Sequence, residues 1–282
     1  MKKTWNVEER IFKQDYKMRM RRFGALVESV ALFGAKVCGW NMEERLDRIQ
    51  RRYAKWILGL DMTTPNYILI EECKLTEIKE KALRGTARYE GKAIESKKEL
   101  VVSECMKERG RNWGNGQEEE RATKRNKGLE EVRNGGTQLE TREEQERMIV
   151  DQIIKERRKR EAEEKGKRIR ESKYNKHYRK IAKEELPKYL KGRMKWKDRK
   201  ILARFRCGNE TKAREYWKEE GEKRCRLCKR KEEDLRHVIE ECRITAGPKD
   251  TEKILNETRE GLIELKTIME KRRAIQDWEE RQ

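Results

Sequence analysis

Residues 225–242 read CRLCKRKEEDLRHVIEEC, and the three cysteines and one histidine of this stretch decide how the C-terminal part is expected to fold. Cys225 and Cys228 are separated by two residues, a gap that lets one tight turn aim both sulfurs at the same point. His237 follows after eight residues and Cys242 after four more. Zinc in structural sites prefers four sulfur and nitrogen ligands in a tetrahedron. The pattern C-x2-C-x8-H-x4-C therefore predicts one Zn2+ ion bound by Cys225, Cys228, His237 and Cys242.

The type of site follows from the ligand set. Three thiolates and one imidazole fill the coordination shell and leave no position for a catalytic water, so the predicted site is structural. Two other interpretations stay open: a chance Cys-x-x-Cys beside a surface histidine, and a redox pair. A redox pair is expected at a strand-to-helix junction, and the surrounding sequence has no βαβ pattern. Leu235, Val238 and Ile239 favour a short helical turn that carries His237.

The remaining cysteines and the ends of the chain bear on its compartment. Cys38, Cys73, Cys105 and Cys207 lack ligand spacing and are expected to be buried thiols, with Cys207 close enough in sequence to be a substitute ligand. The start of the chain lacks the apolar region of a signal peptide, and no apolar run approaches the length of a membrane span. We therefore expect an intracellular protein, nuclear or cytoplasmic and not secreted, with reduced cysteines.

A strongly basic segment precedes the cysteine cluster. Between Lys188 and Arg214 there are eleven basic and two acidic residues, a net charge of +9, with aromatic residues interleaved. Cations can follow a phosphate backbone while exposed rings stack on unpaired bases, which suits RNA or single-stranded DNA. The alternative is that the aromatic residues are core and the cations only solvate a helix. The residues predicted to contact nucleic acid are Lys188, Lys191, Arg193, Lys195, Trp196, Lys197, Arg199, Lys200, Arg204, Arg206, Arg224, Arg226, Lys229 and Arg230.

The composition of the whole chain indicates the same class of partner. The 282 residues include 74 Lys and Arg against 54 Asp and Glu, which gives a formal charge of +20. Each phosphate that a cation neutralises releases a condensed counterion, so a phosphate polymer is the expected partner. A basic protein of a membrane surface usually has an amphipathic helix with a broad apolar face or a lipidation motif, and we find neither.

Composition also limits the fold. With 45% charged and 34% hydrophobic residues, a single core that organises the whole chain is not expected. Prolines number only three, and helix-favouring residues are frequent throughout. We predict a mostly α fold with a helical N-terminal region (1–110), a long charged helical or partly disordered spacer (111–173) and a small basic helical domain (174–282). The zinc knuckle occupies 224–243 within this last domain.

Apolar periodicity predicts the individual helices. Over residues 42–60, apolar side chains recur at spacings of three or four and form one stripe that includes Tyr53 and Trp56, which we expect to be core. In 117–172, acidic residues stand four positions before basic ones, an arrangement that supports an isolated helix by about 0.2–0.5 kcal/mol per pair. Further helices are predicted at 66–73, 76–94, 97–108 and 251–278.

Motifs of catalysis are missing from the sequence. Two-metal polymerases and nucleases need clustered carboxylates, and the eight aspartates of this chain are scattered, with no Asp-Asp pair. There is no P-loop and no GxSxG elbow. His177 has no acid or nucleophile partner in sequence and is expected at the surface. The prediction is that the protein is not an enzyme.

Several segments have a recognisable pattern. Residues 26–40 read LVESVALFGAKVCGW, residues 46–53 read LDRIQRRY, and residues 55–61 read KWILGLD. Residues 204–209 read RFRCGN and precede the cysteine–histidine motif. Together these segments resemble the C-terminal region of reverse transcriptases encoded by non-long-terminal-repeat retrotransposons, the jockey-like elements in particular. Phe33 and Cys38 depart conservatively from the pattern of that family.

The resemblance implies an origin and a partner. It makes the N-terminal region the thumb-like helices that follow the polymerase palm, and the cysteine cluster the terminal CCHC zinc knuckle. In that family this tail is implicated in holding template RNA or target DNA, and the parent activity is RNA-directed DNA polymerase. The palm carboxylates and the endonuclease are absent, so the chain would be a non-catalytic fragment, with the parent polymerase or a retroelement ribonucleoprotein as a partner. The competing interpretations are a zinc-containing protein–protein interaction module and a degenerate remnant without selected function.

Overall fold

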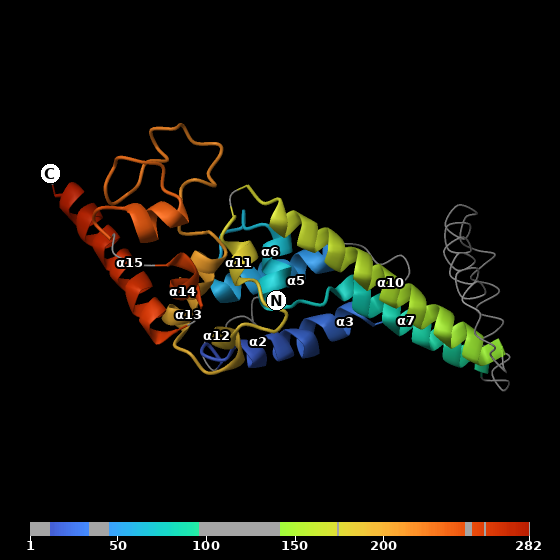
Figure 1. Ribbon diagram of the computed structural model, residues 1–282. Coiled ribbons are helices and arrows are strands. Elements are labelled where there is room, and N and C mark those ends of the chain that lie inside the picture. The colour runs from blue at the N-terminus through green and yellow to red at the C-terminus, as the bar shows by residue number, and fades with distance from the viewer. Residues whose placement is uncertain are drawn as a thin grey trace. The chain divides into compact units, whose positions relative to one another are not determined.

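The regular elements in the described part of the chain are all helices. The computed structural model describes residues 12–33, 45–95, 142–173, 175–245, 250–256 and 258–281. Within these ranges the chain forms eleven α-helices and two π-helical segments, and no β-strand (Figure 1). The predicted mostly α fold is therefore confirmed. Cys38, Cys105 and the helix predicted at 97–108 lie outside the described residues.

The helices are labelled in chain order. The first group is α2 (Tyr16–Phe23), η1 (Gly24–Glu28), α3 (Ser29–Ala31), α5 (Arg45–Leu58), α6 (Asn66–Cys73) and α7 (Ile78–Glu95). The second group is α10 (Arg142–Arg170), α11 (Tyr178–Ile181), α12 (Lys188–Lys191), α13 (Trp196–Arg206), η3 (His237–Glu241), α14 (Thr251–Leu255) and α15 (Arg259–Glu279).

Most of the predicted helices agree with these bounds. The helix predicted at 66–73 is α6, and those predicted at 42–60 and 76–94 are α5 and α7. The single helix predicted at 251–278 is wrong, because the chain breaks between α14 and α15. Thr258 caps the second of them, since its side chain accepts a hydrogen bond from the backbone N–H of Gly261.

The chain divides into two compact units. The first contains the described residues within Met1–Val27, Arg48–Leu75 and Lys165–Gln282, and the second those within Glu28–Asp47 and Thr76–Glu164. This division differs from the predicted boundaries at 110 and 173, because segments from both sides of the predicted spacer share the first unit. Residues 111–141 lie outside the described residues, so the three-part division stays a prediction.

The core of the first unit joins segments that are far apart in sequence. On α5, Tyr53, Ile57 and Leu58 are buried, and Tyr53 stacks on Phe23 of α2 with 4.6 Å between ring centroids. Near the other end of the chain, α13 packs on α14 and α15, and α12 packs on α2. The stripe predicted as core on α5 is confirmed, although Trp56 is only half-buried.

A buried charge cluster lies inside this core. Glu72 of α6 pairs with Arg206 of α13, with 2.5 Å between Oε1 and Nε, and both side chains are fully buried. Tyr178 and Tyr189 donate their hydroxyl protons to the same carboxylate, at 2.8 and 2.7 Å. A buried ion pair is tolerated only when further hydrogen bonds satisfy its remaining atoms, and the two tyrosines do this for Glu72. The cluster fixes α6 against three helices of the C-terminal segment.

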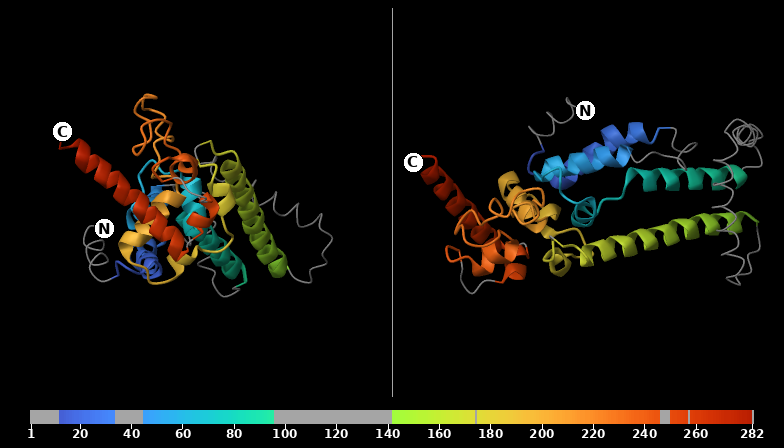
Figure 2. Two further views of the ribbon diagram at one scale, coloured as in Figure 1. Left: turned by 60° about the vertical axis from the view of Figure 1, so that its left-hand side comes forward. Right: turned by 90° about the horizontal axis from the view of Figure 1, so that it is seen from above.

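The second unit contains α7 and most of α10 (Figure 2). Arg158 of α10 pairs with Glu80 of α7, with 2.6 Å between Nε and Oε1, and Arg84 contacts the same carboxylate. Lys81 pairs with Glu28 at 2.5 Å. Arg158 is half exposed, so its pair with Glu80 contributes little on its own. Helix α10 spans 29 residues and shows that this part of the predicted spacer is helical.

Candidate metal centre and the basic residues around it

The first two ligands of the centre sit on a tight turn. The backbone N–H of Lys229 donates to the carbonyl of Cys225 at 2.9 Å, and the N–H of Cys225 donates to the carbonyl of Lys231 at 2.8 Å. An isolated antiparallel bridge between Arg224 and Glu232 closes the turn. Lys229 takes the left-handed conformation, with φ of 57°. This turn brings Cys225 and Cys228 to the same point, as their spacing predicts.

The other two ligands sit at the ends of a π-helical turn. The N–H of His237 donates to the carboxylate of Asp234 at 2.6 Å, which starts the turn. The N–H of Cys242 donates to the carbonyl of His237 at 2.6 Å, an i to i+5 bond. In an α-helix, two residues five apart point in clearly different directions, whereas a π-turn places them nearly one above the other. The π-turn is therefore what lets a four-residue gap aim His237 and Cys242 at one point.

The four candidate ligand atoms converge closely enough to hold one metal ion. All lie within 4.8 Å of one another and all four residues are buried. Cys225 Sγ and Cys242 Sγ are 4.0 Å apart, and Cys228 Sγ is 3.2 Å from His237 Nε2. Zinc–sulfur bonds of about 2.3 Å in a tetrahedron imply sulfur–sulfur edges of roughly 3.8 Å. The residues present fit the ion, and no other such group of three or more occurs in the described part of the chain.

The surroundings shift the pKa values of the first two thiols in opposite directions. Burial works to raise the pKa of Cys228, but hydrogen bonds from the backbone of Arg230 and the side chain of His237 outweigh it and lower the pKa to about 6. Burial raises the pKa of Cys225. Because zinc binds thiolates, Cys228 offers the most readily ionised sulfur of this pair.

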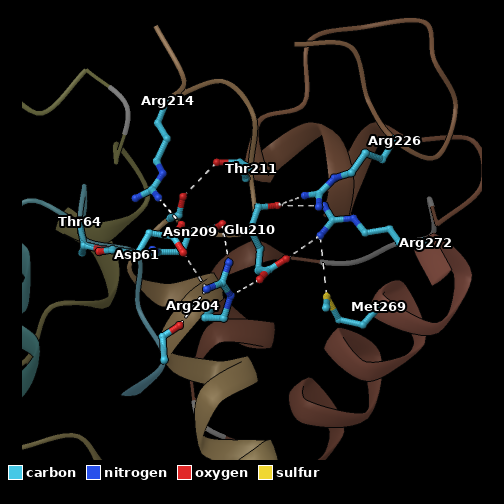
Figure 3. Close-up of polar contacts among 12 residues, drawn as sticks. Asp61, Thr64, Arg204, Asn209, Glu210, Thr211, Arg214, Arg226, Met269 and Arg272 are labelled. Carbon is cyan, nitrogen blue, oxygen red and sulfur yellow. Dashed lines mark hydrogen bonds and ion pairs between the residues drawn. The ribbon is translucent and has the colours of Figure 1, made fainter. Parts of the chain in front are cut away.

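An internal network of ion pairs anchors residues 225–242, which we call the metal turn, to the helices. Glu233 is fully buried and accepts hydrogen bonds from the backbone N–H and the guanidinium of Arg226, the shortest at 2.6 Å. Arg272 of α15 donates to Glu233 at 3.1 Å and to Glu210 at 3.2 Å. Figure 3 shows Arg226 and Arg272 converging beside Glu210. Arg204 completes the chain of contacts by pairing with Glu210.

The same network reaches the loop that follows α5. Arg204 donates to Asp61 Oδ1 at 2.9 Å and to the carbonyl of Gly59 at 2.8 Å, and Arg214 donates to Asp61 Oδ2 at 2.5 Å (Figure 3). Asn209 and Thr64 are also hydrogen bonded to each other. The residues of the RFRCGN stretch therefore connect the loop after α5 to the metal turn.

Four of the predicted nucleic-acid contacts have internal roles. Arg206 is buried with Glu72, and Arg199 is buried and donates to the carbonyls of Tyr189, Gln14 and Gly192. Arg204 and Arg226 are half-buried and paired with Glu210 and Glu233. The guanidinium groups of Arg199 and Arg206 are buried in the core, where they bind carbonyl and carboxylate groups. They are therefore not accessible to a nucleic acid at the surface.

The other predicted contacts lie at the surface. Trp196 and Lys200 are half-buried, and Lys200 Nζ lies 4.2 Å from the centre of the Trp196 ring. Two of the exposed cations also have acidic neighbours, since Lys191 pairs with Glu185 and Lys229 with Glu279. The exposed members of the predicted set are Lys188, Lys191, Arg193, Lys195, Lys197, Arg224, Lys229 and Arg230.

Some residues have surroundings that the sequence reasoning did not identify. Tyr216 and Trp217 are 70% and 54% exposed and form a T-shaped pair with 5.1 Å between ring centroids. The sequence signal for this exposed aromatic pair is a Tyr-Trp dipeptide that stands near several basic residues. His177, predicted at the surface, is partly buried and lies with Nε2 2.9 Å from the carbonyl of Arg206. Cys73 and Cys207 are buried thiols as predicted, and Cys207 is not part of the metal cluster.

Comparison with known proteins adds no relative. No family model, no curated protein and no solved structure matches this chain. Among the described residues, none of the helices has the length and apolar character that crossing a membrane requires.

Proposed function

We propose that this protein is a non-catalytic nucleic-acid-binding protein whose C-terminal module is stabilised by one structural zinc ion. The observation that carries the proposal is the position of Arg224, Lys229 and Arg230, which are exposed on the turn that holds the buried Cys225 and Cys228. A metal that fixes such a turn also fixes the spacing of its cations, and fixed cations bind phosphates without the full entropic cost of ordering a loop.

RNA or single-stranded DNA is the proposed partner. The first unit carries further exposed cations around α12 and α13, and the exposed Tyr216 and Trp217 provide rings on which unpaired bases can stack. Base stacking on aromatic side chains tolerates any sequence, whereas a duplex hides its base faces. This favours single strands over a duplex as the partner.

The origin of the chain forms a further part of the proposal. Its support is the resemblance of residues 26–40, 46–61 and 204–209, together with the cysteine–histidine motif, to the tail of non-long-terminal-repeat reverse transcriptases. On this proposal the chain acts beside a parent polymerase or in a retroelement ribonucleoprotein. The absence of an Asp-Asp pair from the sequence supports a binding role without catalysis.

The test combines metal analysis with a salt titration. The purified protein should contain one zinc per chain, and its affinity for a single-stranded RNA should fall as salt rises. For single strands the slope of log K against log salt is about −0.7 per phosphate contact, so several contacts give a slope of roughly −3 or steeper. A salt-independent interaction, or none at low salt, would contradict nucleic-acid binding.

A protein-interaction function is favoured by a different observation. Val30 and Phe33 of the second unit are 73% and 91% exposed and stand three residues apart. Exposed apolar side chains at helical spacing are typical of surfaces that bind another protein. Replacing Val30 and Phe33 by serine would abolish binding to such a partner and leave RNA affinity unchanged. A variant that keeps its affinity for the partner would contradict the protein-interaction function.

A further inference from the structure

A hollow on the first unit contains aromatic, apolar and basic side chains. Its volume is about 550 Å³, and Trp56, Trp196, Leu60 and Met62 provide its aromatic and apolar lining. Trp56 is held in place by Tyr53, with 5.7 Å between ring centroids, and by the guanidinium of Arg19, 4.4 Å from the ring centre. The hollow thus has a fixed indole from α5 and a second indole from the start of α13.

All the charged residues that line the hollow are basic. These are Arg19, Arg52 and Lys200, and no carboxylate is among the lining residues. The nearest acid in sequence is Asp61, whose two oxygens are occupied by Arg204 and Arg214. The site therefore favours an anion, and its two indole rings favour a flat, aromatic one.

Lys200 reaches this place because residue 59 is glycine. Gly59 has a φ of +62°, and a Cβ there would lie 1.7 Å from Lys200 Cε. The missing side chain lets the aliphatic part of Lys200 cross the turn after α5 and brings its ammonium to 4.2 Å from the centre of the Trp196 ring. Lys13 Nζ lies 4.3 Å from the same ring centre. Two cations are therefore held beside one aromatic surface.

We infer that this hollow binds one unpaired nucleotide of a single strand, with the base against the tryptophans and the phosphate on Arg52 and Lys200. The inference rests on the proposed function and makes it more specific. A cation over an exposed ring contributes about 0.5–1 kcal/mol, whereas a stacked base contributes about 1–3 kcal/mol, so a base can displace an ammonium from Trp196. The displaced ammonium then neutralises the phosphate that the base carries.

The test compares two variants of the hollow with two matched control variants outside it. Arg52 and Arg48 are both exposed on α5 and stand one turn apart, but only Arg52 lines the hollow. Trp278 is an exposed tryptophan of α15 and does not line it. The variants are therefore Arg52→Gln against Arg48→Gln, and Trp196→Leu against Trp278→Leu. The probe is a short fluorescent oligouridylate, whose dissociation constant is measured with the full chain at fixed low salt.

The outcomes separate this inference from the proposed function. Trp196→Leu should weaken binding roughly ten-fold and Arg52→Gln several-fold, with both controls close to the parent protein. If the parent protein binds and Arg52→Gln and Trp196→Leu lose no more affinity than their controls, the hollow is not the site, and nucleic-acid binding elsewhere stands. If the parent protein does not bind the probe at low salt, the proposed function falls and takes this inference with it. Because Arg52 is exposed, its replacement keeps the test decisive even if Trp196→Leu unfolds the protein.

Discussion

The guanidinium of Arg272 lies 3.1 Å from the carboxylate of Glu233, and this contact joins the last helix to the metal turn. Glu233 also accepts a hydrogen bond from the backbone N–H of Arg226, which directly follows the candidate ligand Cys225. The metal turn is therefore held by the helical body as well as by its own ligands. Loss of the contact should affect both the stability of the module and its hold on zinc.

Replacing Arg272 by methionine should lower the free energy of unfolding by about 3 kcal/mol. This is the low end of the loss of stability expected when a buried ion pair is broken, because each carboxylate retains another partner. Glu233 still pairs with Arg226, and Glu210 still pairs with Arg204. The measurement is urea-induced unfolding in the presence of zinc. Arg273→Met is the control, since Arg273 is exposed and adjacent. Equal effects of the two substitutions would show that the contact is unimportant.

Replacing Glu72 by glutamine should cost about 3–5 kcal/mol of stability, because it leaves Arg206 as a buried charge without its carboxylate. The neighbouring Glu71 pairs with Lys74 and Lys165 at a partly exposed position, so Glu71→Gln should cost about 1 kcal/mol or less. Thermal unfolding of the two variants gives the comparison. A Glu72→Gln protein as stable as Glu71→Gln would contradict the role given to the buried cluster.

Stability should fall as pH decreases through the range in which His177 titrates. Burial lowers the pKa of His177 below its usual 6.5, although the hydrogen bond to the carbonyl of Arg206 opposes this. Below about pH 6.5 the unfolded chain therefore binds a proton that the folded chain does not, and the free energy of unfolding decreases by at most about 1.4 kcal/mol per pH unit.

The matched variant for this effect is His177→Gln, whose amide can still donate to the carbonyl of Arg206. Zinc ligands also take up protons in acid, so the quantity to compare is the difference between parent and variant at about pH 7.5 and pH 5.5. The variant should lose less stability than the parent protein when the pH falls from about 7.5 to about 5.5. If the free energy of unfolding falls equally in the parent protein and the variant, His177 is not the cause of the pH dependence.

Reversing the charges of Arg193, Lys195 and Lys197 to glutamate should weaken binding to single-stranded RNA at least roughly ten-fold at low salt and flatten the salt dependence. All three are exposed around α12 and α13, so the fold should survive. Arg199 is left unchanged, because its buried guanidinium supports the core. The control reverses Lys159, Arg160 and Lys167 of α10, which are also exposed and change the net charge equally. Equal losses would indicate attraction by net charge alone.

The sequence predicted those features whose cause is local. The apolar spacing in 42–60 predicts α5, and the three gaps between the four ligands predict the cysteine–histidine cluster, because each depends on residues close together along the chain. The roles of Arg199 and Arg206 were not predictable in this way. The partner of Arg206, Glu72, is 134 residues away, and a cation in a basic segment has the same sequence pattern whether it faces a carboxylate or solvent.

The sequence contains a local signal for the break between α14 and α15, but the apolar periodicity of 251–278 conceals it. Apolar residues continue at helical spacing across it, so the pattern predicts one helix. Thr258 is a good N-cap, and Gly261 allows α15 to approach α14, since a Cβ at 261 would lie 2.1 Å from the carbonyl oxygen of Ile254. Because threonine is a preferred N-cap residue, Thr258 indicates a new helix start even though the apolar spacing continues across it.

X-ray absorption at the zinc edge tests the central claim most directly. The purified protein should give a first shell of three sulfur atoms at about 2.3 Å and one nitrogen at about 2.0–2.1 Å. Cys242→Ser should remove one sulfur from that shell or release the metal. A shell of only oxygen and nitrogen, or a metal-free protein in which the turn of residues 225–242 stays folded, would contradict the assignment of Cys225, Cys228, His237 and Cys242 as zinc ligands.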